Sequence, residues 1–362
     1  MHRNLQTTPR EDGLRWPAEW EPHRATWLAW PHNPDTWPGR LEEAEIAFVE
    51  MVRALEANEQ VCVLVGSEAE EARVRSRLTK SGVGSGVAFH RVPNDDAWIR
   101  DTGPIFLEGP GARLAAVDFG FDSWGRKYPP WDRDAAVATA VSAARGVPRY
   151  QAGFVLEGGS VDGNGEGTVL TTTSCLLNPN RRSGEPKRGP DGVPGRRREE
   201  MEARLREWLC AEEVLWLGEG IEGDDTDGHI DGVARFVGPT TVVVAEEADA
   251  SDPNHAVLAE NLRRLRSMND ARGRRLSVVS LPMPPPVWED GVRCPASYAN
   301  FYLANGCVLV PVFDTLSDER ALRILAELLP GREAVPIPAR ALVVGLGAVH
   351  CLTQQEPQVP TA

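Results

Sequence analysis

The sequence lacks any apolar stretch long enough to cross a lipid bilayer. A membrane-spanning helix needs roughly 20 consecutive apolar residues, whereas the longest apolar runs here, such as 242–245, have the length of strands. Charged residues interrupt the first 16 positions, so no secretory signal is visible. We therefore expect a cytoplasmic protein that has no membrane partner.

Positive charge is scarce relative to negative charge. Lysine and arginine together number 39 against 53 aspartates and glutamates, and lysine occurs only at Lys80, Lys127 and Lys187. The resulting net charge of −14 argues against a nucleic-acid partner. It weakly favours a small cationic substrate, because the field of the protein attracts positive charge.

Cysteine and histidine are few, at six and seven residues, and no two cysteines form a C-x-x-C pair. No spacing typical of a zinc site is present. Disulfides are not expected in a chain of this length without a secretion signal. We expect neither a metal nor an organic cofactor.

The chain does contain a regular alternation of helical and strand-like segments. With 362 residues, 41% of them hydrophobic, it can bury a large core. Apolar residues recur with helical spacing in 41–58, 68–78, 134–145, 199–210, 254–268 and 317–329. Short β-rich runs lie between them at 61–65, 87–92, 214–217, 276–281 and 334–337. This alternation predicts an α/β protein.

Strand pairs separated by glycine-bearing turns form a second pattern, at 105–119, 160–172, 232–245 and 300–312. Glycine accepts the positive φ that tight hairpin turns require. The hairpins recur about every 50 to 70 residues, which indicates a repeated helix–strand–hairpin module. A fifth hairpin would pair 347–353 with a strand near 26–30, and chain ends meeting in one module would close a ring. These repeats predict one pseudo-symmetric, propeller-like α/β domain over residues 1–362.

One segment has the composition of a loop rather than of a helix or strand. Residues 181–198 are rich in glycine, proline and arginine. Such a composition is typical of a flexible surface excursion within a domain. We therefore predict a flexible loop at 181–198.

Cys351 is the first candidate for a chemical role. It follows an apolar run, 341–344, predicted to be a strand, and the glycines Gly345 and Gly347. Glycines give the backbone freedom to aim a side chain, and a nucleophilic thiol needs access to substrate, so the thiol is expected to be exposed. His350 is expected to point to the opposite face. An inert, packed thiol is the alternative that this segment alone leaves open.

An acidic cluster follows a predicted strand. The segment Asn94–Asp101 contains three carboxylates around Trp98, and strand ends are where α/β folds usually build sites. A planar guanidinium binds bidentate acceptors and stacks on aromatic faces. The cluster is therefore consistent with a pocket for a cation, although pairing of Arg100 with a neighbouring aspartate would explain it structurally.

A second cluster, Asp224–Asp231, carries His229 and Asp231 two positions apart on a predicted strand. Residues at this spacing project from the same face, so both side chains would reach one cavity. Metal binding is the competing explanation, but no third ligand with suitable spacing is visible.

Glu157 stands directly before two glycines, Gly158 and Gly159. The glycines indicate either a tight turn or a close approach of the backbone to another group. Glu157 is then either an exposed loop acid or a carboxylate that orients an imidazole.

Together these segments resemble the agmatine deiminase group of guanidine-modifying enzymes over nearly the whole chain. The motifs occur in the family's order at 17–23 (PAEWEPH), 94–104 (NDDAWIRDTGP), 157–160 (EGGS), 175–178 (CLLN), 226–231 (TDGHID), 297–302 (SYANFY) and 350–355 (HCLTQQ). The resemblance implies a five-bladed pseudo-symmetric α/β propeller, the pentein fold, in agreement with the hairpin count. One departure is Leu346, which stands where the family's terminal turn has the middle of three glycines.

The resemblance also implies covalent hydrolysis of a guanidinium to a ureido group and ammonia. Cys351 is expected to attack the guanidinium carbon, and Asp96 and Asp231 are expected to hold its nitrogens. His229 is expected to protonate the departing ammonia and then to activate water, with Glu157 accepting from its ring. The imidazolium and the bound cation are expected to lower the pKa of Cys351.

The expected substrate is agmatine, whose far end carries an ammonium rather than a carboxylate. The segment 222–227 offers carboxylates and no cation, so we expect Asp225 or Asp227 to receive that ammonium. Trp98 and Trp30 are expected to line the aliphatic stem of the substrate.

Other assignments stay open at the level of the sequence. An amidinotransferase would use the same thiouronium intermediate but pass it to an amine, whereas a peptidyl-arginine deiminase would need an open groove. A binding scaffold without catalysis would not need the thiol, imidazole and carboxylates together. A thiol protease has no use for paired carboxylates around its nucleophile. The resemblance further suggests a homo-oligomer.

Overall fold

The computed structural model describes residues 7–111, 113–181 and 198–359. Within them, five sheets share one pattern, in which an antiparallel strand pair is extended by a parallel strand. A further hairpin joins β13 (Val287–Glu289) to β14 (Val292–Cys294). The described residues therefore form the mixed α/β fold that the alternation of helices and strands predicts.

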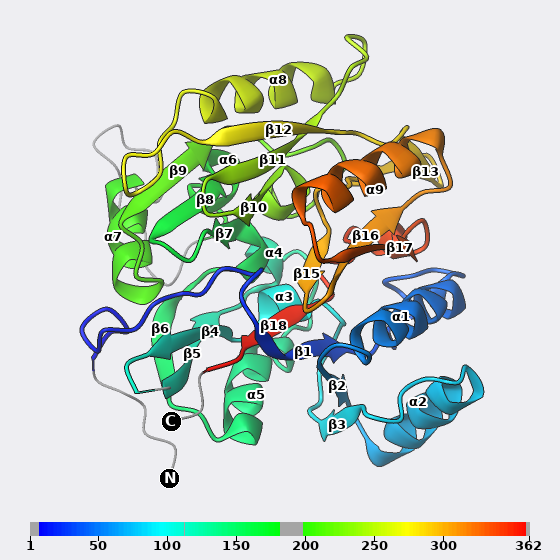
Figure 1. Cartoon of the computed structure of the whole chain (residues 1–362). Coiled ribbons are helices and arrows are strands. Elements are labelled where there is room, and N and C mark those ends of the chain that lie inside the picture. The colour runs from blue at the N-terminus through cyan, green and yellow to red at the C-terminus, as the bar shows by residue number, and fades with distance from the viewer. Residues whose placement is uncertain (1–6, 112, 182–197, 360–362) are drawn as a thin grey trace.

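The first sheet joins the two ends of the chain (Figure 1). Its strand β1 (His23–Ala29) pairs antiparallel with β18 (Gln354–Pro357) and parallel with β2 (Gln60–Val65), which is followed by β3 (Ala88–Arg91). The predicted pairing of the chain ends is confirmed, but the C-terminal strand begins at Gln354 rather than within 347–353. That earlier stretch is occupied by turns.

The other four sheets repeat the pattern in chain order. Their strands are β4 (Ile105–Gly109), β5 (Arg113–Gly120) and β6 (Arg149–Val155); β7 (Val161–Gly163), β8 (Thr168–Thr172) and β9 (Glu213–Leu217); β10 (Ala234–Gly238), β11 (Thr241–Glu246) and β12 (Ser277–Pro282); β15 (Tyr302–Ala304), β16 (Cys307–Val312) and β17 (Glu333–Pro338). The first two strands of each sheet are the four hairpins that the glycine-bearing turns predict, so this prediction is confirmed.

One long helix connects each pair of parallel strands, because parallel strands need a crossover connection. These helices are α1 (Leu41–Leu55), α5 (Val137–Arg145), α7 (Arg198–Trp208), α8 (Asn254–Leu265) and α9 (Leu316–Leu328), and α2 (Glu68–Lys80) precedes β3. Short helices lie in other connections. They are α3 (Ile99–Thr102), α4 (Ser123–Arg126), α6 (Thr173–Leu176), and the 3₁₀ turns η1 (Asp134–Ala136), η2 (Gly158–Ser160), η3 (Ile230–Gly232) and η4 (Leu342–Gly345).

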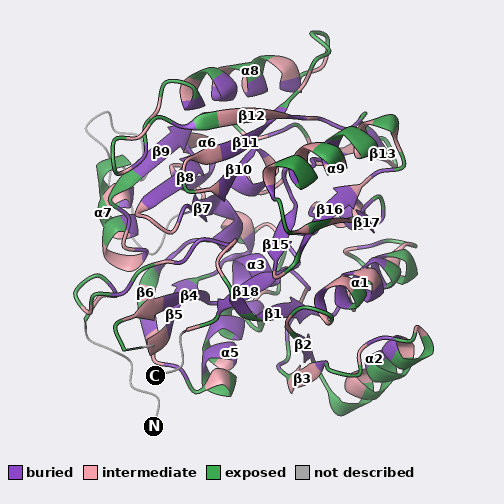
Figure 2. Ribbon diagram, viewed as in Figure 1, coloured by how far each residue is buried: buried purple, intermediate pink, exposed green. Residues whose placement is uncertain are grey.

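Most strands are buried, β3, β12 and β17 are largely intermediate or exposed, and the outer faces of the long helices are exposed (Figure 2). The largest apolar cluster unites the first and last sheets with α1, through side chains such as Trp30, Phe48 and Phe313. It continues into the C-terminal turn and includes Cys351. The hydrophobic core therefore reaches directly to the segment that carries the candidate nucleophile.

Two predictions of local structure near the site are wrong. Residues 341–344 form a 3₁₀ turn rather than a strand, and Leu346 ends it with a left-handed φ of 69°. This backbone conformation costs a non-glycine residue about 1–2 kcal/mol. The predicted strand for His229 and Asp231 is also absent, since His229 directly precedes the 3₁₀ turn η3, Asp231 lies within it, and β10 starts only at Ala234.

Of the predicted loop at 181–198, the structure describes only the two end residues, because 182–197 lie outside the described residues. At its ends, Arg181 is completely buried and Arg198 begins α7. Arg181 is therefore part of the folded interior rather than of a surface loop. In the portion of the chain that the structure describes, every helix is too short or too polar to span a bilayer.

Candidate active site

Cys351 lies in the turn between η4 and β18, with only 8% of its surface exposed. Its Sγ accepts a hydrogen bond from Asn300 Nδ2 at 3.3 Å and lies 3.6 Å from Asp231 Oδ2. The backbone N–H of Arg100 donates to the Cys351 carbonyl at 3.2 Å, which ties the turn to α3. The expectation of an exposed thiol is wrong, because the turn packs the sulfur against the polar side chains of Asn300 and Asp231 from two other segments.

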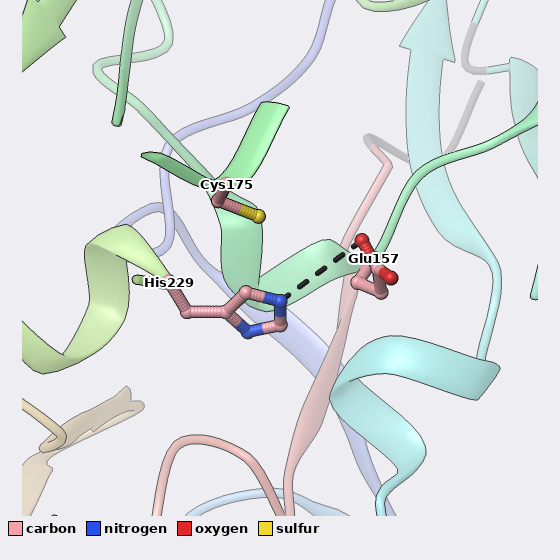
Figure 3. A group of neighbouring side chains, drawn as sticks. All are labelled: Glu157, Cys175 and His229. Carbon is pink, nitrogen blue, oxygen red and sulfur yellow. Dashed lines mark ion pairs between the residues drawn. The ribbon is translucent and has the colours of Figure 1, made fainter. Parts of the chain in front are cut away.

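His229 approaches the same region from the start of η3, and it is buried. Its Nε2 lies 4.0 Å from Glu157 Oε2 (Figure 3), and its Nδ1 lies 3.8 Å from Asp101 Oδ1. Burial lowers the pKa of His229, but Asp101, Cys175 and Asp231 outweigh it and raise that pKa well above its ordinary value. The ring is therefore positively charged at neutral pH.

Glu157 is completely buried beside the Arg181 guanidinium. Arg181 donates from Nε to Glu157 Oε1 at 2.8 Å and from its terminal nitrogens to Asp227 and to the Thr226 carbonyl. This leaves Glu157 Oε2 free to face His229. A buried carboxylate needs such a partner, since an isolated buried charge is strongly destabilising.

Asp231, His350 and Glu19 form a chain of hydrogen bonds that starts at the carboxylate next to the Cys351 sulfur. His350 Nδ1 lies 2.7 Å from Asp231 Oδ2, and its Nε2 lies 2.9 Å from Glu19 Oε2. Burial opposes ionisation of Glu19, yet Arg235, His350 and Arg100 hold its pKa well below its usual range. The expectation that His350 points away from the site is wrong, because residues 350 and 351 lie in a turn and not on a strand.

Gly159 explains why the EGGS segment contains glycines. A Cβ at this position would lie 2.6 Å from His229 Nδ1 and 2.9 Å from both Asp101 Oδ1 and Asp231 Oδ2. Three functional side chains therefore converge on one bare backbone position. Of the two roles that the sequence left open for these glycines, close approach applies to Gly159.

Asp101 was missed by the sequence analysis as a site residue. It accepts hydrogen bonds from the Gly159 N–H and from Trp124 Nε1, both at 2.9 Å. Burial raises its pKa, and the neighbouring carboxylates Asp231 and Glu157 add to that effect against the His229 charge. The adjacent Arg100 suggested a simple local ion pair, but that side chain turns instead to Glu19.

The remaining candidates of the acidic segment take different positions. Asp96 accepts hydrogen bonds from Thr36 and from the Ala97 N–H, and burial raises its pKa. Trp98 packs against Gly347, where a Cβ would lie 2.5 Å from its ring, so this side chain supports the turn that carries Cys351. Among the described contacts, none joins Asp96 directly to the Cys351 sulfur.

The carboxylates proposed for the far end of the substrate already have cationic partners. Lys127 Nζ lies 3.2 Å from both Asp225 Oδ1 and Asp227 Oδ1, and Arg181 also pairs with Asp227. The sequence segment contains no cation, but the fold supplies two from elsewhere in the chain. Trp30 lies in the core, where its Nε1 donates to Glu45 at 2.8 Å.

The charged groups that act most strongly on the Cys351 sulfur are carboxylates, so they disfavour the thiolate. Burial raises the pKa of the Cys351 thiol well above its ordinary value, and Asp231 and Asp101 raise it further. In the protein without substrate the sulfur is therefore a neutral thiol. A cation placed beside it would reverse this effect and favour the thiolate.

A buried thiol, a charged imidazole and several carboxylates on repeated α/β modules define a class of protein: cysteine-dependent enzymes that act on planar cations. The sequence model of the Porphyromonas-type peptidyl-arginine deiminase family matches residues 15–357. The chain belongs to this family.

Named relatives are similar over their full length. The chain is 39% identical over 376 residues to the agmatine deiminase of Ectopseudomonas mendocina, covering 98% of each. Its fold matches a structure of the agmatine deiminase of Enterococcus faecalis catalysing its reaction, with a TM-score of 0.90, 33% identity, and coverage of 99% and 100%. It also matches a C. jejuni agmatine deiminase with substrate bound, with a TM-score of 0.83, 28% identity, and coverage of 96% and 97%.

Proposed function

We propose that this protein is an agmatine deiminase, which hydrolyses agmatine to N-carbamoylputrescine and ammonia. The observation that carries the proposal is the 3.6 Å separation between the Cys351 Sγ and Asp231 Oδ2, inside a buried anionic cluster that contains a charged His229. Full-length similarity to proteins named agmatine deiminase supports the choice of substrate.

Binding of the guanidinium is the first step. Asp231 and Asp96 accept hydrogen bonds from its nitrogens, each charge-assisted bond contributing about 1.5–3 kcal/mol. The substrate cation offsets the anionic field of Asp231 and Asp101 and so lowers the pKa of Cys351. The thiol then loses its proton to solvent.

Formation of the covalent intermediate follows. The Cys351 thiolate adds to the guanidinium carbon, and His229 transfers its proton to the departing nitrogen. Breaking of that carbon–nitrogen bond releases ammonia and leaves a cationic S-alkylthiouronium on the sulfur. Glu157, facing the ring through Oε2, stabilises the imidazolium before this transfer.

Hydrolysis of the intermediate regenerates the enzyme. His229, now neutral, takes a proton from water as the oxygen adds to the thiouronium carbon. Collapse of the adduct breaks the carbon–sulfur bond, and the hydroxyl proton of the adduct passes to the departing sulfur. This step yields the ureido product and restores the Cys351 thiol. The ammonia takes up the proton that the thiol released, so the products are N-carbamoylputrescine and ammonium.

The access to Cys351 bears on the choice between agmatine and an arginyl peptide, because the two substrates differ in size. The descriptive name of the family refers to the peptide. The 8% exposure of Cys351 favours a slender chain over a folded polypeptide. Since Asp225 and Asp227 are paired with Lys127 and Arg181, any ammonium at that end must compete with existing cations. An amidinotransferase would also form a thiouronium on the cysteine, but it would expel the alkyl amine instead of ammonia and pass the amidino group to another amine.

The test is to measure ammonia release from agmatine, arginine and an arginyl peptide in separate reactions without an added amine. Agmatine is expected to be the preferred substrate, and Cys351→Ala is expected to abolish turnover while leaving agmatine binding measurable by calorimetry. A preference for the arginyl peptide, or ammonia release that requires an added acceptor amine, would exclude the agmatine deiminase assignment.

The five similar sheets support a finer description of the fold. We propose that they are the blades of a pseudo-symmetric α/β propeller that is a single domain, closed by the β1–β18 pairing. A homo-oligomer and a cytoplasmic location are also part of the proposal. Light scattering of the purified protein and cell fractionation test these two points.

A further inference from the structure

Three buried side chains form a cluster that the proposed reaction does not fully use. Glu157, Cys175 and His229 each offer one ligand atom, and these atoms all lie within 4.8 Å of one another (Figure 3). Cys175 comes from α6, Glu157 precedes η2, and His229 precedes η3. In the reaction proposed above, the Cys175 thiol has no role.

Between Glu157 and His229, the atoms that face this cluster are joined only by the 4.0 Å ion pair of Glu157 Oε2 with His229 Nε2. Among the described residues, Glu157 Oε2 and both ring nitrogens of His229 are buried without a hydrogen bond. Buried polar atoms without partners are rare in folded proteins, because each costs the free energy of removing it from water. Open polar atoms on two side chains around a thiol indicate a position that receives a ligand.

We propose that this cluster is an inhibitory site for a soft divalent cation of the zinc class. One thiolate, one imidazole and one carboxylate are the ligand types that Zn²⁺ prefers, and three protein ligands leave a fourth position for water. The metal site does not depend on the substrate, whereas its inhibitory effect rests on the proposed function.

Metal binding requires a contraction of the cluster, whose three ligand atoms lie within 4.8 Å of one another. In a tetrahedral site with bonds of about 2.1 Å, neighbouring ligand atoms are about 3.4 Å apart. His229 Nε2 and Glu157 Oε2 are 4.0 Å apart. The two side chains would therefore approach by about 0.6 Å, which side-chain rotation can supply.

The surroundings fit such a site. Asp101 Oδ1 lies 3.8 Å from His229 Nδ1, the ring nitrogen that would not bind the metal. A carboxylate on that nitrogen is the usual outer partner of a metal-bound histidine. Arg181 holds Glu157 Oε1, so Glu157 would bind through one oxygen only. The positive charge of Arg181 opposes the metal, and the charges of Asp101 and Asp231 favour it.

Metal binding has a defined proton balance. Cys175 loses its thiol proton and His229 loses its imidazolium proton, so one Zn²⁺ replaces two protons. The metal-bound ring then lacks the imidazolium proton that would pass to the leaving group. Turnover stops although the Cys351 thiol is unaltered, and a chelator restores it.

The decisive experiment uses Co²⁺ as a spectroscopic probe in the Cys351→Ala variant, which removes the nucleophile and all turnover. We expect a thiolate-to-Co²⁺ charge-transfer band in the near ultraviolet with one metal per chain. The band is expected to disappear in the Cys351→Ala/Cys175→Ser double variant and to persist in Cys351→Ala/Cys62→Ser. Cys62 is a matched control, since it is a buried thiol in β2.

A second measurement covers the case in which Cys175→Ser does not fold, which circular dichroism would reveal. In the Cys351→Ala background, Glu157→Gln is expected to weaken Zn²⁺ binding at least tenfold in a chelator competition while preserving the Co²⁺ band. Absence of a band in Cys351→Ala, or a band that Cys175→Ser leaves intact, overturns the proposal. Failure of the deiminase assignment shows separately, as a lack of ammonia from agmatine.

Discussion

Arg181 and Glu157 form an ion pair at 2.8 Å in which neither side chain has any exposed surface. The same guanidinium bonds to Asp227 and to the Thr226 carbonyl, in the segment that leads to His229. Arg181 therefore connects the carboxylate that faces the imidazole to the loop that presents the imidazole. It acts as a positioning residue, because its contacts are with Glu157 and this loop rather than with reacting atoms.

Replacing Arg181 tests whether this residue positions Glu157 and the His229 loop or contributes to the binding of agmatine. In Arg181→Gln we expect kcat for agmatine to fall at least tenfold, while agmatine affinity measured in the Cys351→Ala background changes less than threefold. Arg181→Lys restores the charge but not the planar fork, so it is expected to recover activity only in part. Breaking a buried pair costs about 3–5 kcal/mol of stability, which thermal unfolding would report.

The matched control for that substitution is Arg198→Gln. Arg198 forms an exposed pair with Glu202, a type of pair that contributes about 0–1 kcal/mol. Kinetics and unfolding of this variant are expected to match the wild type. Equal losses of agmatine affinity and kcat in Arg181→Gln would contradict the positioning role.

The fold could be predicted where local signals repeat. Glycine-bearing turns and helical periodicity identify the four hairpins of the repeated sheets and each crossover helix, because these patterns depend on neighbours in sequence. The β13–β14 hairpin was not predicted. The C-terminal strand was placed too early because Gln354, Gln355 and Glu356 are polar. They are nevertheless buried, and Glu356 is satisfied by Arg145 and Trp27 from distant segments.

Candidate site residues were predicted less completely, since contacts between distant segments leave no local pattern. Glu19 lies in the N-terminal motif, yet its role as the acceptor for His350 depends on the folded chain. The charge argument for Asp225 and Asp227 considered only their own segment. Lys127, about a hundred positions earlier in the chain, is the cation that this argument could not include.

Asp101 is predicted to control the alkaline limb of the pH–rate profile. It is the largest contributor that raises the pKa of His229, against the opposing effect of burial. The protonated ring is the acid that releases ammonia, so activity falls as the pH rises through that pKa. Asp101→Asn lowers the pKa of His229 and is expected to shift the alkaline limb of kcat to lower pH.

The measurement is kcat for agmatine across the pH range in both proteins. Asp132→Asn, which changes an exposed carboxylate, serves as the control and is expected to leave the profile unaltered. A shift of the alkaline limb to higher pH in Asp101→Asn would contradict the assigned role of His229.

Gly159 is predicted to tolerate no side chain. The added methyl group of Gly159→Ala would meet His229, Asp101 and Asp231 at 2.6–2.9 Å, so these groups must move apart. Because small displacements of reacting groups are costly to catalysis, we expect kcat to fall at least a hundredfold. Gly86→Ala is the matched control, since its methyl group would enter open space without a left-handed φ. Steady-state kinetics and unfolding midpoints of both variants test this.

Asp231→Asn is predicted to raise the alkylation rate of Cys351 and to lower the deiminase activity of the protein. Burial raises the pKa of the thiol and the Asp231 charge raises it further, so removing that charge lowers the pKa. At neutral pH the thiolate fraction increases, and alkylation by the neutral reagent iodoacetamide is expected to accelerate at least threefold. Deiminase activity is expected to fall sharply, because both the guanidinium and His350 lose their carboxylate partner.

Peptide mapping after brief alkylation distinguishes this effect from unfolding. Unfolding would expose every buried cysteine, whereas a lower pKa at one sulfur modifies Cys351 and leaves Cys175 intact. Asp225→Asn is the matched control, since Asp225 is a partly exposed carboxylate paired with Lys127. It is expected to leave the alkylation rate unchanged. Slower alkylation in Asp231→Asn would mean that Asp231 promotes thiolate formation in the free protein, contrary to the charge distribution around the sulfur.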